Sequence, residues 1–170
     1  MNISEAKERF IQAWGAFGSE WGVNRTMAQV HALLLISENP LCADDIMEKL
    51  MISRGNANMN IRALIDWGLA FKELKPGDRK EYFVAEKEMW NIVRKIAIQR
   101  RKKELEPVLK TLEEIAQLTD TNPEAEEFIR VTQNIKTFAL RADNFLDLMI
   151  NADTNWLLSS ILNKTLRNKD

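Results

Sequence analysis

The sequence has few of the residues that build disulfides, metal centres and long loops. It contains one cysteine, Cys42, and one histidine, His31, so no internal disulfide can form and an ordinary structural zinc site has too few ligands. With 6 glycines, 4 prolines and no low-complexity tract, the chain is expected to be mostly helix with short loops. We therefore expect neither a metal nor any other cofactor.

Long apolar runs and an excess of one charge are missing as well. The longest apolar stretch is the short HALLLI segment, whereas a membrane-spanning helix needs about 20 such residues. The opening segment MNISEAKERF lacks the apolar core of a signal peptide, which together with the single cysteine favours a cytoplasmic protein without a membrane partner. The formal net charge is -1 with 29% charged residues, so any contact with nucleic acid must come from local charge.

Three helical patterns occupy the first fifty residues. Ser4 is placed to cap the first and Thr26 to cap the second, which ends before Pro40. The third, LCADDIMEKLMIS, is a short helix with Asp44 and Asp45 near its positive N-terminal end. Residues at three- and four-residue spacing on one face of the first helix predict that this face packs against a partner surface: Ala6, Phe10, Trp14, Phe17 and Trp21.

A fourth helix carries an unusual outer face. Ser53 is placed to cap RGNANMNIRALIDWGL, in which an apolar stripe from Ala57 to Ile65 points inward and Gly68 follows the last turn. A typical solvated helix carries Glu and Lys, whereas this one has asparagines, which are poor helix formers, and no acid before Asp66. The residues of the outer face and its flanks are Arg54, Gly55, Asn56, Asn58, Met59 and Arg62.

Two short strands follow directly. LAFKEL and EYFVAE have the composition of strands and flank KPGDRK, whose Pro-Gly-Asp supplies turn chemistry, so a β-hairpin is expected at residues 70–85. Lys75, Arg79 and Lys80 gather at its tip, and Asp78 is the only acid in the loop itself. The tip is therefore locally basic.

The rest of the chain returns to helical patterns. One runs from residue 87 to about residue 118 through the basic run RRKK, and Pro107 is expected to kink or restart it. Asn122 and Pro123 begin another, and Asp153 is placed to cap a last one. Apolar residues in the helix after Pro123 repeat in alternating steps of three and four, a seam that favours coiled-coil or bundle packing: Phe128, Val131, Ile135, Phe138, Ala142, Phe145 and Met149.

This order of elements predicts a mainly α fold with a small β-hairpin wing. Three helices followed by a two-stranded hairpin form a winged helix-turn-helix. The third helix of this motif, which is the fourth helix of the chain, enters the major groove, and the wing touches the DNA backbone or minor groove. We divide the chain into an N-terminal helix at 1–22 that contributes to a dimer region, a winged helix-turn-helix domain at 23–86, and a helical dimerisation and possible effector region at 87–170.

The outer face of the fourth helix has the chemistry of base and phosphate recognition. Arginines can reach guanine acceptors or phosphates, asparagines can pair with adenine edges, and Met59 can touch a thymine methyl. Gly55 allows close backbone approach near a helix N-terminus, which itself favours phosphate. The wing cations add salt-dependent affinity that does not depend on sequence. The predicted DNA-contact residues are Ser53, Arg54, Gly55, Asn56, Asn58, Met59, Arg62, Lys75, Arg79 and Lys80.

The runs RTMAQVHALLLIS, DDIMEKLMISRGNANMNIRALIDWGL and FKELKPGDRKEYFVAEK resemble the GbsR-type branch of the MarR family of transcriptional regulators. The resemblance covers roughly residues 1 to 118. It implies an obligate homodimer with interleaved terminal helices, which binds double-stranded DNA at a pseudo-palindromic operator and releases it on binding a small effector. In related regulators a Ser or Thr precedes the second helix of the motif and touches phosphate, whereas Cys42 stands there in this sequence.

The leading hypothesis is therefore a homodimeric transcriptional regulator, expected to be a repressor. No nucleophile beside a base and no phosphate-binding glycine loop is found, so the chain is not expected to be an enzyme. Two alternatives remain open: a winged-helix module that binds another protein, and a small-molecule sensor without DNA binding. Aromatic residues that could form an effector site, although core packing explains them better, are Trp14, Phe17, Trp21 and Trp90.

Single residues outside this set have simpler interpretations. Cys42 could be a redox-sensing thiol at a helix N-terminus, but an inert small residue is favoured because Asp44 and Asp45 oppose a thiolate. His31 is expected to be a partly buried packing residue. The RRKK run, Arg100 to Lys103, is expected to be a solvated face and not a DNA contact.

Overall fold

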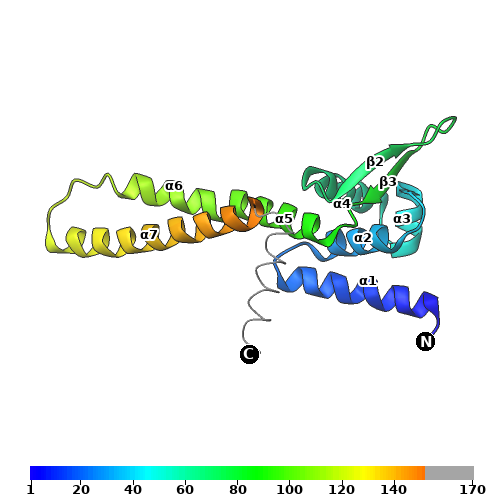
Figure 1. Cartoon of the computed structure of the whole chain (residues 1–170), viewed down its shortest axis with the longest axis horizontal. Helices are drawn as coiled ribbons and strands as arrows, with labels where there is room; N and C mark the ends of the chain where they lie inside the picture. Colours follow the sequence, from blue (N-terminus) through cyan, green and yellow to red (C-terminus); the bar gives the residue numbers. More distant parts are fainter. Residues whose placement is uncertain (152–170) are drawn as a thin grey trace, which may run out of the picture. The chain divides into compact units, whose positions relative to one another are not determined.

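Residues 1–151 are described by a computed structural model, and they fall into two units (Figure 1). Unit 1 is Met1–Lys95 and unit 2 begins at Ile96. The last predicted helix, with its cap Asp153, lies outside the described residues. The elements in chain order are α1 (Ile3–Glu20), α2 (Arg25–Ile36), β1 (Leu41–Cys42), α3 (Ala43–Leu50), α4 (Arg54–Asp66), β2 (Ala70–Leu74), β3 (Glu81–Ala85), α5 (Met89–Arg100), the π-helical turn η1 (Arg101–Leu105), α6 (Glu106–Ile115) and α7 (Pro123–Asn151).

Asparagines cap the first two helices, so the predicted caps Ser4 and Thr26 are wrong. The Asn2 side chain accepts a hydrogen bond from the Glu5 backbone N–H at 2.9 Å, and the Glu5 carboxylate accepts one from the Asn2 N–H at 3.2 Å. Asn24 accepts from the Met27 N–H at 3.1 Å in the same way. Each asparagine lies two residues before the predicted cap and satisfies an unpaired N–H of the first turn earlier in the chain.

Small residues bring α1 against α2, and of the aromatic stripe Trp14 joins this contact through His31 of α2, with ring centroids 6.2 Å apart. Gly15 and Gly18 are buried in this contact, and a Cβ added to Gly18 would lie 2.6 Å from the Cβ of Ala28. The aromatic rings run along the flank of α1, and Phe17 and Trp21 remain 52% and 53% exposed. Core packing among residues 1–151 therefore does not account for these two side chains, contrary to the interpretation favoured from the sequence.

The core of unit 1 is centred on α2. Seven of the twelve residues of α2 are buried, because α1 covers one side of this helix and α4 another. The inward stripe predicted for α4 is confirmed at Ala57, Ile61 and Leu64, which are at most 2% exposed. The largest fully buried side chains among the described residues are Val30, Leu34, Ile46, Ile61, Leu64 and Ile92.

The hairpin predicted at 70–85 is present and belongs to a three-stranded antiparallel sheet ordered β1-β3-β2. Ala70 pairs with Ala85 and Leu74 with Glu81, which fixes the register of the hairpin. The Asp78 N–H bonds the Lys75 carbonyl at 3.1 Å across Pro76 and Gly77, and Gly77 has φ +82. This is a type II turn, with proline and glycine at the two positions that suit them. The two-residue strand β1 is too short to give a sequence pattern.

Unit 2 pairs α6 and η1 with the long helix α7. Pro107, in the first turn of α6, lacks the N–H that an α-helix needs, and the helix widens into the π-helical turn η1 directly before it. Of the two predicted outcomes, the restart is the one found, because α6 begins at Glu106 with Pro107 in its first turn. Arg101 on η1 holds α7 through both carboxylate oxygens of Asp143 and through Asp147, the latter at 3.0 Å.

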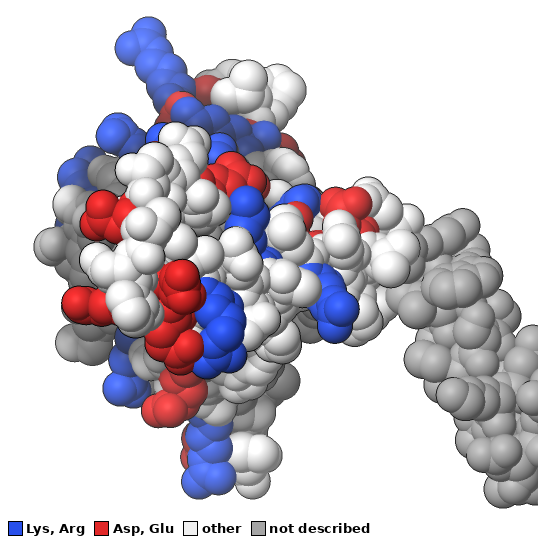
Figure 2. All heavy atoms as spheres, turned by 90° about the vertical axis from the view of Figure 1, so that its left-hand side faces the viewer, with Lys and Arg blue, Asp and Glu red and all other residues white. Residues whose placement is uncertain are grey.

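The helix α7 begins where the sequence predicts, because Asn122 accepts a hydrogen bond from the Ala125 N–H at 2.8 Å. The face of α7 that is buried within unit 2 contains Ala125 and Ala139. The predicted apolar seam lies on another face, where Phe138 is 75% exposed and Phe145 62% exposed. Basic and acidic side chains are interspersed among uncharged ones on the face of the molecule shown in Figure 2. Because Phe138 and Phe145 are exposed, the seam is an apolar face without a partner inside the described chain.

Candidate nucleic-acid interface

The helix α4 presents its predicted outer face to solvent. The Ser53 hydroxyl accepts a hydrogen bond from the Asn56 N–H at 3.3 Å and starts the helix, as the sequence predicts. Because Ala57, Ile61 and Leu64 point into the core, the opposite side of the helix faces outward. The exposed members of the predicted contact set on this helix and at its cap are Ser53, Arg54, Gly55, Met59 and Arg62.

The asparagines of α4 divide into two roles. Asn56 and Asn58 are half-buried, whereas Asn60, which the sequence reasoning missed, is 2% exposed. The Asn60 amide donates hydrogen bonds to the Asn56 side-chain oxygen at 2.7 Å and to the Asn56 carbonyl at 2.8 Å. Asn60 falls on the inward stripe three residues after Ala57, so its spacing could have revealed it. Asn56 is held in place by this pair, which limits the rotamers it can offer to a base edge.

The tip of the hairpin is an ordered turn. Asp78 accepts hydrogen bonds from the Lys80 backbone N–H at 2.9 Å and from the Tyr82 hydroxyl at 2.7 Å. The hydrogen bond to Asp78 raises the pKa of Tyr82 to about 12. The ammonium of Lys75 lies 3.8 Å from the centre of the Tyr82 ring. Asp78, the acid of this turn, is therefore already hydrogen-bonded within the hairpin that carries the wing cations.

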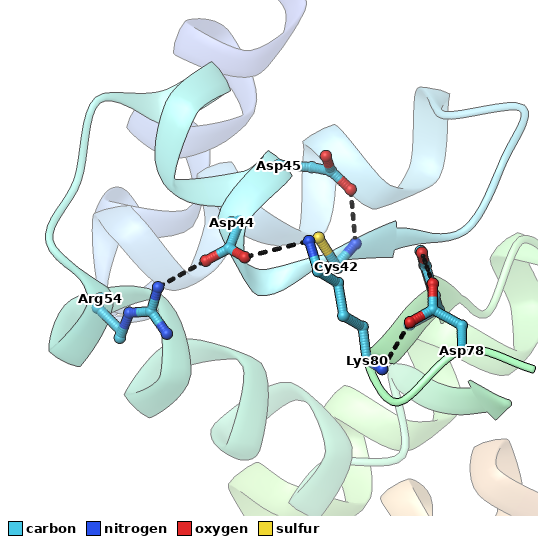
Figure 3. Close-up of polar contacts among 7 residues, drawn as sticks. Cys42, Asp44, Asp45, Arg54, Asp78 and Lys80 are labelled. Atoms are coloured by element: carbon cyan, nitrogen blue, oxygen red, sulfur yellow. Dashed lines mark hydrogen bonds and ion pairs between the residues drawn. The ribbon is translucent and has the colours of Figure 1, made fainter. Parts of the chain in front are cut away.

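An acid of α3 joins the recognition helix to the wing. Asp44 pairs with Arg54 of α4 at 2.7 Å through one oxygen and with Lys80 of the wing at 3.5 Å through the other (Figure 3). The Lys80 side chain runs up from the hairpin past Cys42 to reach it. The pKa of Lys80 is raised, first by the neighbouring Cys42 sulfur and then by Asp44.

Two cations of the predicted set differ from Arg54 and Lys80. Arg62 and Arg79 are exposed, and neither pairs with an acid within residues 1–151. Gly55 is open, since a Cβ there would meet nothing within 4 Å. The candidate interface thus combines two unpaired arginines with two cations that an internal carboxylate holds.

Cys42 is buried and is the N-cap residue of α3. Its backbone N–H donates to Asp45 at 2.8 Å, and this bond, followed by one from the Cys42 thiol, lowers the pKa of Asp45. A buried thiol beside two acids agrees with the interpretation of Cys42 as an inert small residue.

The aromatic candidates for an effector site do not form one cluster. The rings of Phe10, Trp14, Phe17 and Trp21 follow one another along α1 with centroids 5.4 to 6.0 Å apart. Trp90 lies in the first turn of α5, and no ring contact joins it to this row within the described part of the chain. The basic run is partly neutralised, because Arg100 pairs with Glu104 and Arg101 with acids of α7.

Metal-binding clusters and membrane-spanning helices are both absent from the described residues. No group of three or more His, Cys, Asp or Glu side chains that could hold a metal ion occurs in residues 1–151. Over the same residues, no helix combines the length and the apolar character needed to cross a bilayer.

The helices of unit 1 with their sheet and projecting hairpin define a winged helix-turn-helix protein (Figure 1). Residues 21–81, about a third of the chain, match the MarR family model, and no curated protein matches the chain. The crystal structure of a transcriptional regulator, 16% identical, aligns over 85% of this chain and 95% of its own with a TM-score of 0.65. This likeness shows that the chain has that fold.

Two further solved structures are more distant. A mutant of S. aureus MepR bound to an oligodeoxyribonucleotide is 15% identical over 81% of this chain and 92% of its own, with a TM-score of 0.40. A transcriptional regulator from Thermotoga maritima is 14% identical over 84% of this chain and 94% of its own, also with a TM-score of 0.40. Neither likeness is close enough to carry an argument.

Proposed function

We propose that this protein is a sequence-specific DNA-binding transcriptional regulator that acts as a homodimeric repressor on a pseudo-palindromic operator. The observation that carries the proposal is the outer face of α4, where Arg54, Gly55, Met59 and Arg62 are exposed beside a basic hairpin in a winged-helix unit. The MarR family match over residues 21–81 covers α4 and the hairpin as far as the first residue of β3, and it supports the proposal. Assignment to the GbsR-type branch remains a prediction.

The division of labour follows from the chemistry of the side chains. Arg62 reads a guanine edge, because an unpaired guanidinium on the middle of a groove-entering helix can donate two parallel hydrogen bonds. Asn58 meets an adenine edge, and Met59 meets a thymine methyl. Arg79 and Lys75 on the hairpin bind phosphates and add affinity for any duplex. The first turn of α4, with Ser53 and Gly55, approaches a phosphate closely.

Apolar faces that have no partner among the described residues support assembly into a dimer. Unpartnered rings project from α1, and the seam of α7 leaves Phe138 and Phe145 in solvent. Scattered apolar residues are normal on a surface, but a regular seam along a long helix is typical of a helix-packing interface. We propose that residues 1–22 and 87–170 build the dimer and that residues 23–86 bind the operator.

Dimer geometry gives a route to regulation. Two recognition helices must lie roughly 34 Å apart to meet successive major grooves on one side of a duplex. A small effector that changes this spacing alters affinity for the operator. The aromatic row Trp14, Phe17 and Trp21 on α1 is the proposed effector surface, and Trp90 is a separate candidate.

Selection of binding sites from a random DNA pool tests the proposal. The full chain should enrich sites with two inverted half-sites about one helical turn apart, and the affinity for random duplex should fall steeply as salt rises. A module that binds only proteins, or a sensor that has no DNA function, would enrich no sequence and would bind little duplex at any salt. Failure to enrich any sequence, or weak duplex binding at every salt concentration, would reject the proposal of a DNA-binding regulator.

A further inference from the structure

Asp44 occupies an unexpected place in the candidate interface. It lies in the first turn of α3, and its two carboxylate oxygens contact cations from two different elements, Arg54 of α4 and Lys80 of the wing (Figure 3). Both cations belong to the set predicted to contact DNA. A carboxylate that binds an arginine and a lysine offers them the charge and the oxygen acceptors that a phosphate of DNA would offer.

The pairs are exposed to solvent and are therefore weak enough to exchange. The side chains of Arg54 and Asp44 are 68% and 48% exposed, and that of Lys80 is 57% exposed. Ion pairs at such positions contribute little to folding stability, because water and salt screen them and both side chains lose conformational freedom. The two ion pairs therefore add little to the stability of the fold. Their main effect is on any anion that approaches the same two cations.

The same geometry is not found at the other proposed contacts. Arg62 and Arg79 pair with no acid in the described part of the chain, and Lys75 rests on the Tyr82 ring. Asp78, the acid of the wing loop, is occupied by the Lys80 backbone N–H and by Tyr82. Asp44 therefore acts on one part of the interface, where the start of the recognition helix meets the wing.

Resting on the DNA-binding function proposed above, we propose that Asp44 is a built-in competitor of DNA phosphates, which holds Arg54 and Lys80 in the free protein and lowers its affinity for duplex of random sequence. A random duplex offers mainly phosphates, so binding there must break both ion pairs and leave the Asp44 carboxylate beside the negative backbone. An operator also supplies base contacts to Arg62 and its neighbours, and these offset the same cost. Asp44 thereby reduces capture of the protein by DNA outside its operator.

The competition has a signature in the dependence on salt. When a phosphate displaces Asp44, the released carboxylate takes up a cation from solution, which cancels part of the cation release from DNA. Removing the carboxylate restores that release, so the slope of log affinity against log salt should steepen by up to about 0.9. A change that altered only the packing of α3 would leave the slope as it was.

The test compares Asp44→Asn with a matched change on the same helix. Glu48→Gln removes one negative charge a single turn further along α3, where the side chain is exposed and no ion pair is found in the described structure. Affinity of the full chain for a random duplex is measured by fluorescence anisotropy across a salt series, and thermal melting verifies that both variants are folded. Asp44→Asn should bind random duplex about three- to tenfold more tightly, with the steeper slope.

A second comparison isolates the pairing itself. Arg54→Gln should weaken duplex binding more in the Asp44→Asn background than in the native chain, because only there is Arg54 free for phosphate from the start. Equal gains for Asp44→Asn and Glu48→Gln would reduce the effect to net charge and overturn the inference. Weaker binding by Asp44→Asn would show that Asp44 positions the two cations, which also overturns it. In both cases the DNA-binding function stands, whereas absence of duplex binding by the native chain at every salt removes function and inference together.

Discussion

His31 lies in the contact between α1 and α2, with its ring 6.2 Å from that of Trp14. It is 3% exposed, and its Nε2 has no hydrogen-bond partner among the described residues. Burial away from water lowers the pKa of His31 to about 4, since the imidazolium would lose its hydration without gaining an acceptor. The folded protein therefore holds this residue neutral at all ordinary pH values.

This depression makes the stability of unit 1 dependent on pH. In the unfolded chain His31 takes up a proton near its ordinary pKa of 6.5, whereas the folded chain does so only near pH 4. The contribution of His31 is fully present above pH 6.5 and is lost as the pH falls toward 4. Between about pH 7.5 and pH 5 the free energy of unfolding should drop by about 2 kcal/mol, measured by urea denaturation.

The variant His31→Leu provides the control for this prediction. Without a titrating group at this position, the free energy of unfolding should be nearly level between about pH 7.5 and pH 5, even if the variant is less stable overall. An unchanged slope in the variant would assign the pH dependence to other groups. The carboxylates with lowered pKa, such as Asp45 and Glu86, act at lower pH and do not interfere in this window.

Arg62 is the residue on which base recognition is expected to depend most. It is exposed and lies off the inward stripe of α4, so Arg62→Ala should leave the fold intact while weakening binding to the selected operator by about 1–3 kcal/mol. Arg9→Ala removes the same side chain from an exposed position on α1 and should have little effect. Equal operator affinity in the native chain and in Arg62→Ala, by electrophoretic mobility shift, would refute the assignment of α4 as the recognition helix.

At the scale of elements, the approach of α1 to α2 depends on the absence of side chains at Gly15 and Gly18. An alanine Cβ at position 18 would lie 2.6 Å from the Cβ of Ala28, and neither group can turn away because both are attached directly to the backbone. The two helices would have to move apart. The gain in helix propensity from Gly to Ala, about 1 kcal/mol, does not offset such overpacking.

We therefore expect Gly18→Ala to destabilise the protein by about 1–3 kcal/mol in thermal or urea unfolding. Gly55→Ala is the matched control, because Gly55 is also in a helix but has nothing within 4 Å of the added Cβ, and it should be neutral or stabilising by up to about 1 kcal/mol. If both variants were stabilised alike, the α1–α2 contact would be looser than described. The same Gly55→Ala protein should bind duplex more weakly if Gly55 approaches a phosphate.

At the scale of the whole molecule, the apolar seam of α7 is expected to pack against a second copy of the chain. Phe138 and Phe145 of the seam are 75% and 62% exposed, which is a large apolar area to leave in water on one helix. Phe138→Asp places a charge in the proposed dimer interface twice, once from each copy. Since burial of one phenylalanine contributes roughly 1.5–3 kcal/mol, association should weaken by more than about 3 kcal/mol per dimer.

Sedimentation equilibrium measures this change. The native chain should be a dimer at micromolar concentration, and Phe138→Asp should be largely monomeric or should fail to fold. Gln133→Glu adds the same charge at an exposed polar position of α7 outside the seam and should remain dimeric. A dimer of normal strength in the folded Phe138→Asp variant would place the interface elsewhere.

The arrangement of elements was accessible from the sequence because it depends on local signals. Ser53, Asn122 and the Pro76-Gly77 turn act on their immediate neighbours, and their predicted roles are confirmed. Periodicity likewise predicted the inward stripe of α4, and turn chemistry with local charge predicted the hairpin and its basic tip. The predicted boundaries of the three regions, 1–22, 23–86 and 87–170, remain predictions.

Tertiary structure alone decided which groups meet across elements. Three findings follow from how helices pack: Asp44 faces both Arg54 and Lys80, Gly18 contacts α2 while Phe17 and Trp21 stay exposed, and the seam of α7 has no partner within the described chain. Local spacing specifies the face a residue occupies on its own helix, because that face follows from 3.6 residues per turn. What lies opposite that face is set by the free energy of packing the whole unit, to which residues distant in the sequence contribute.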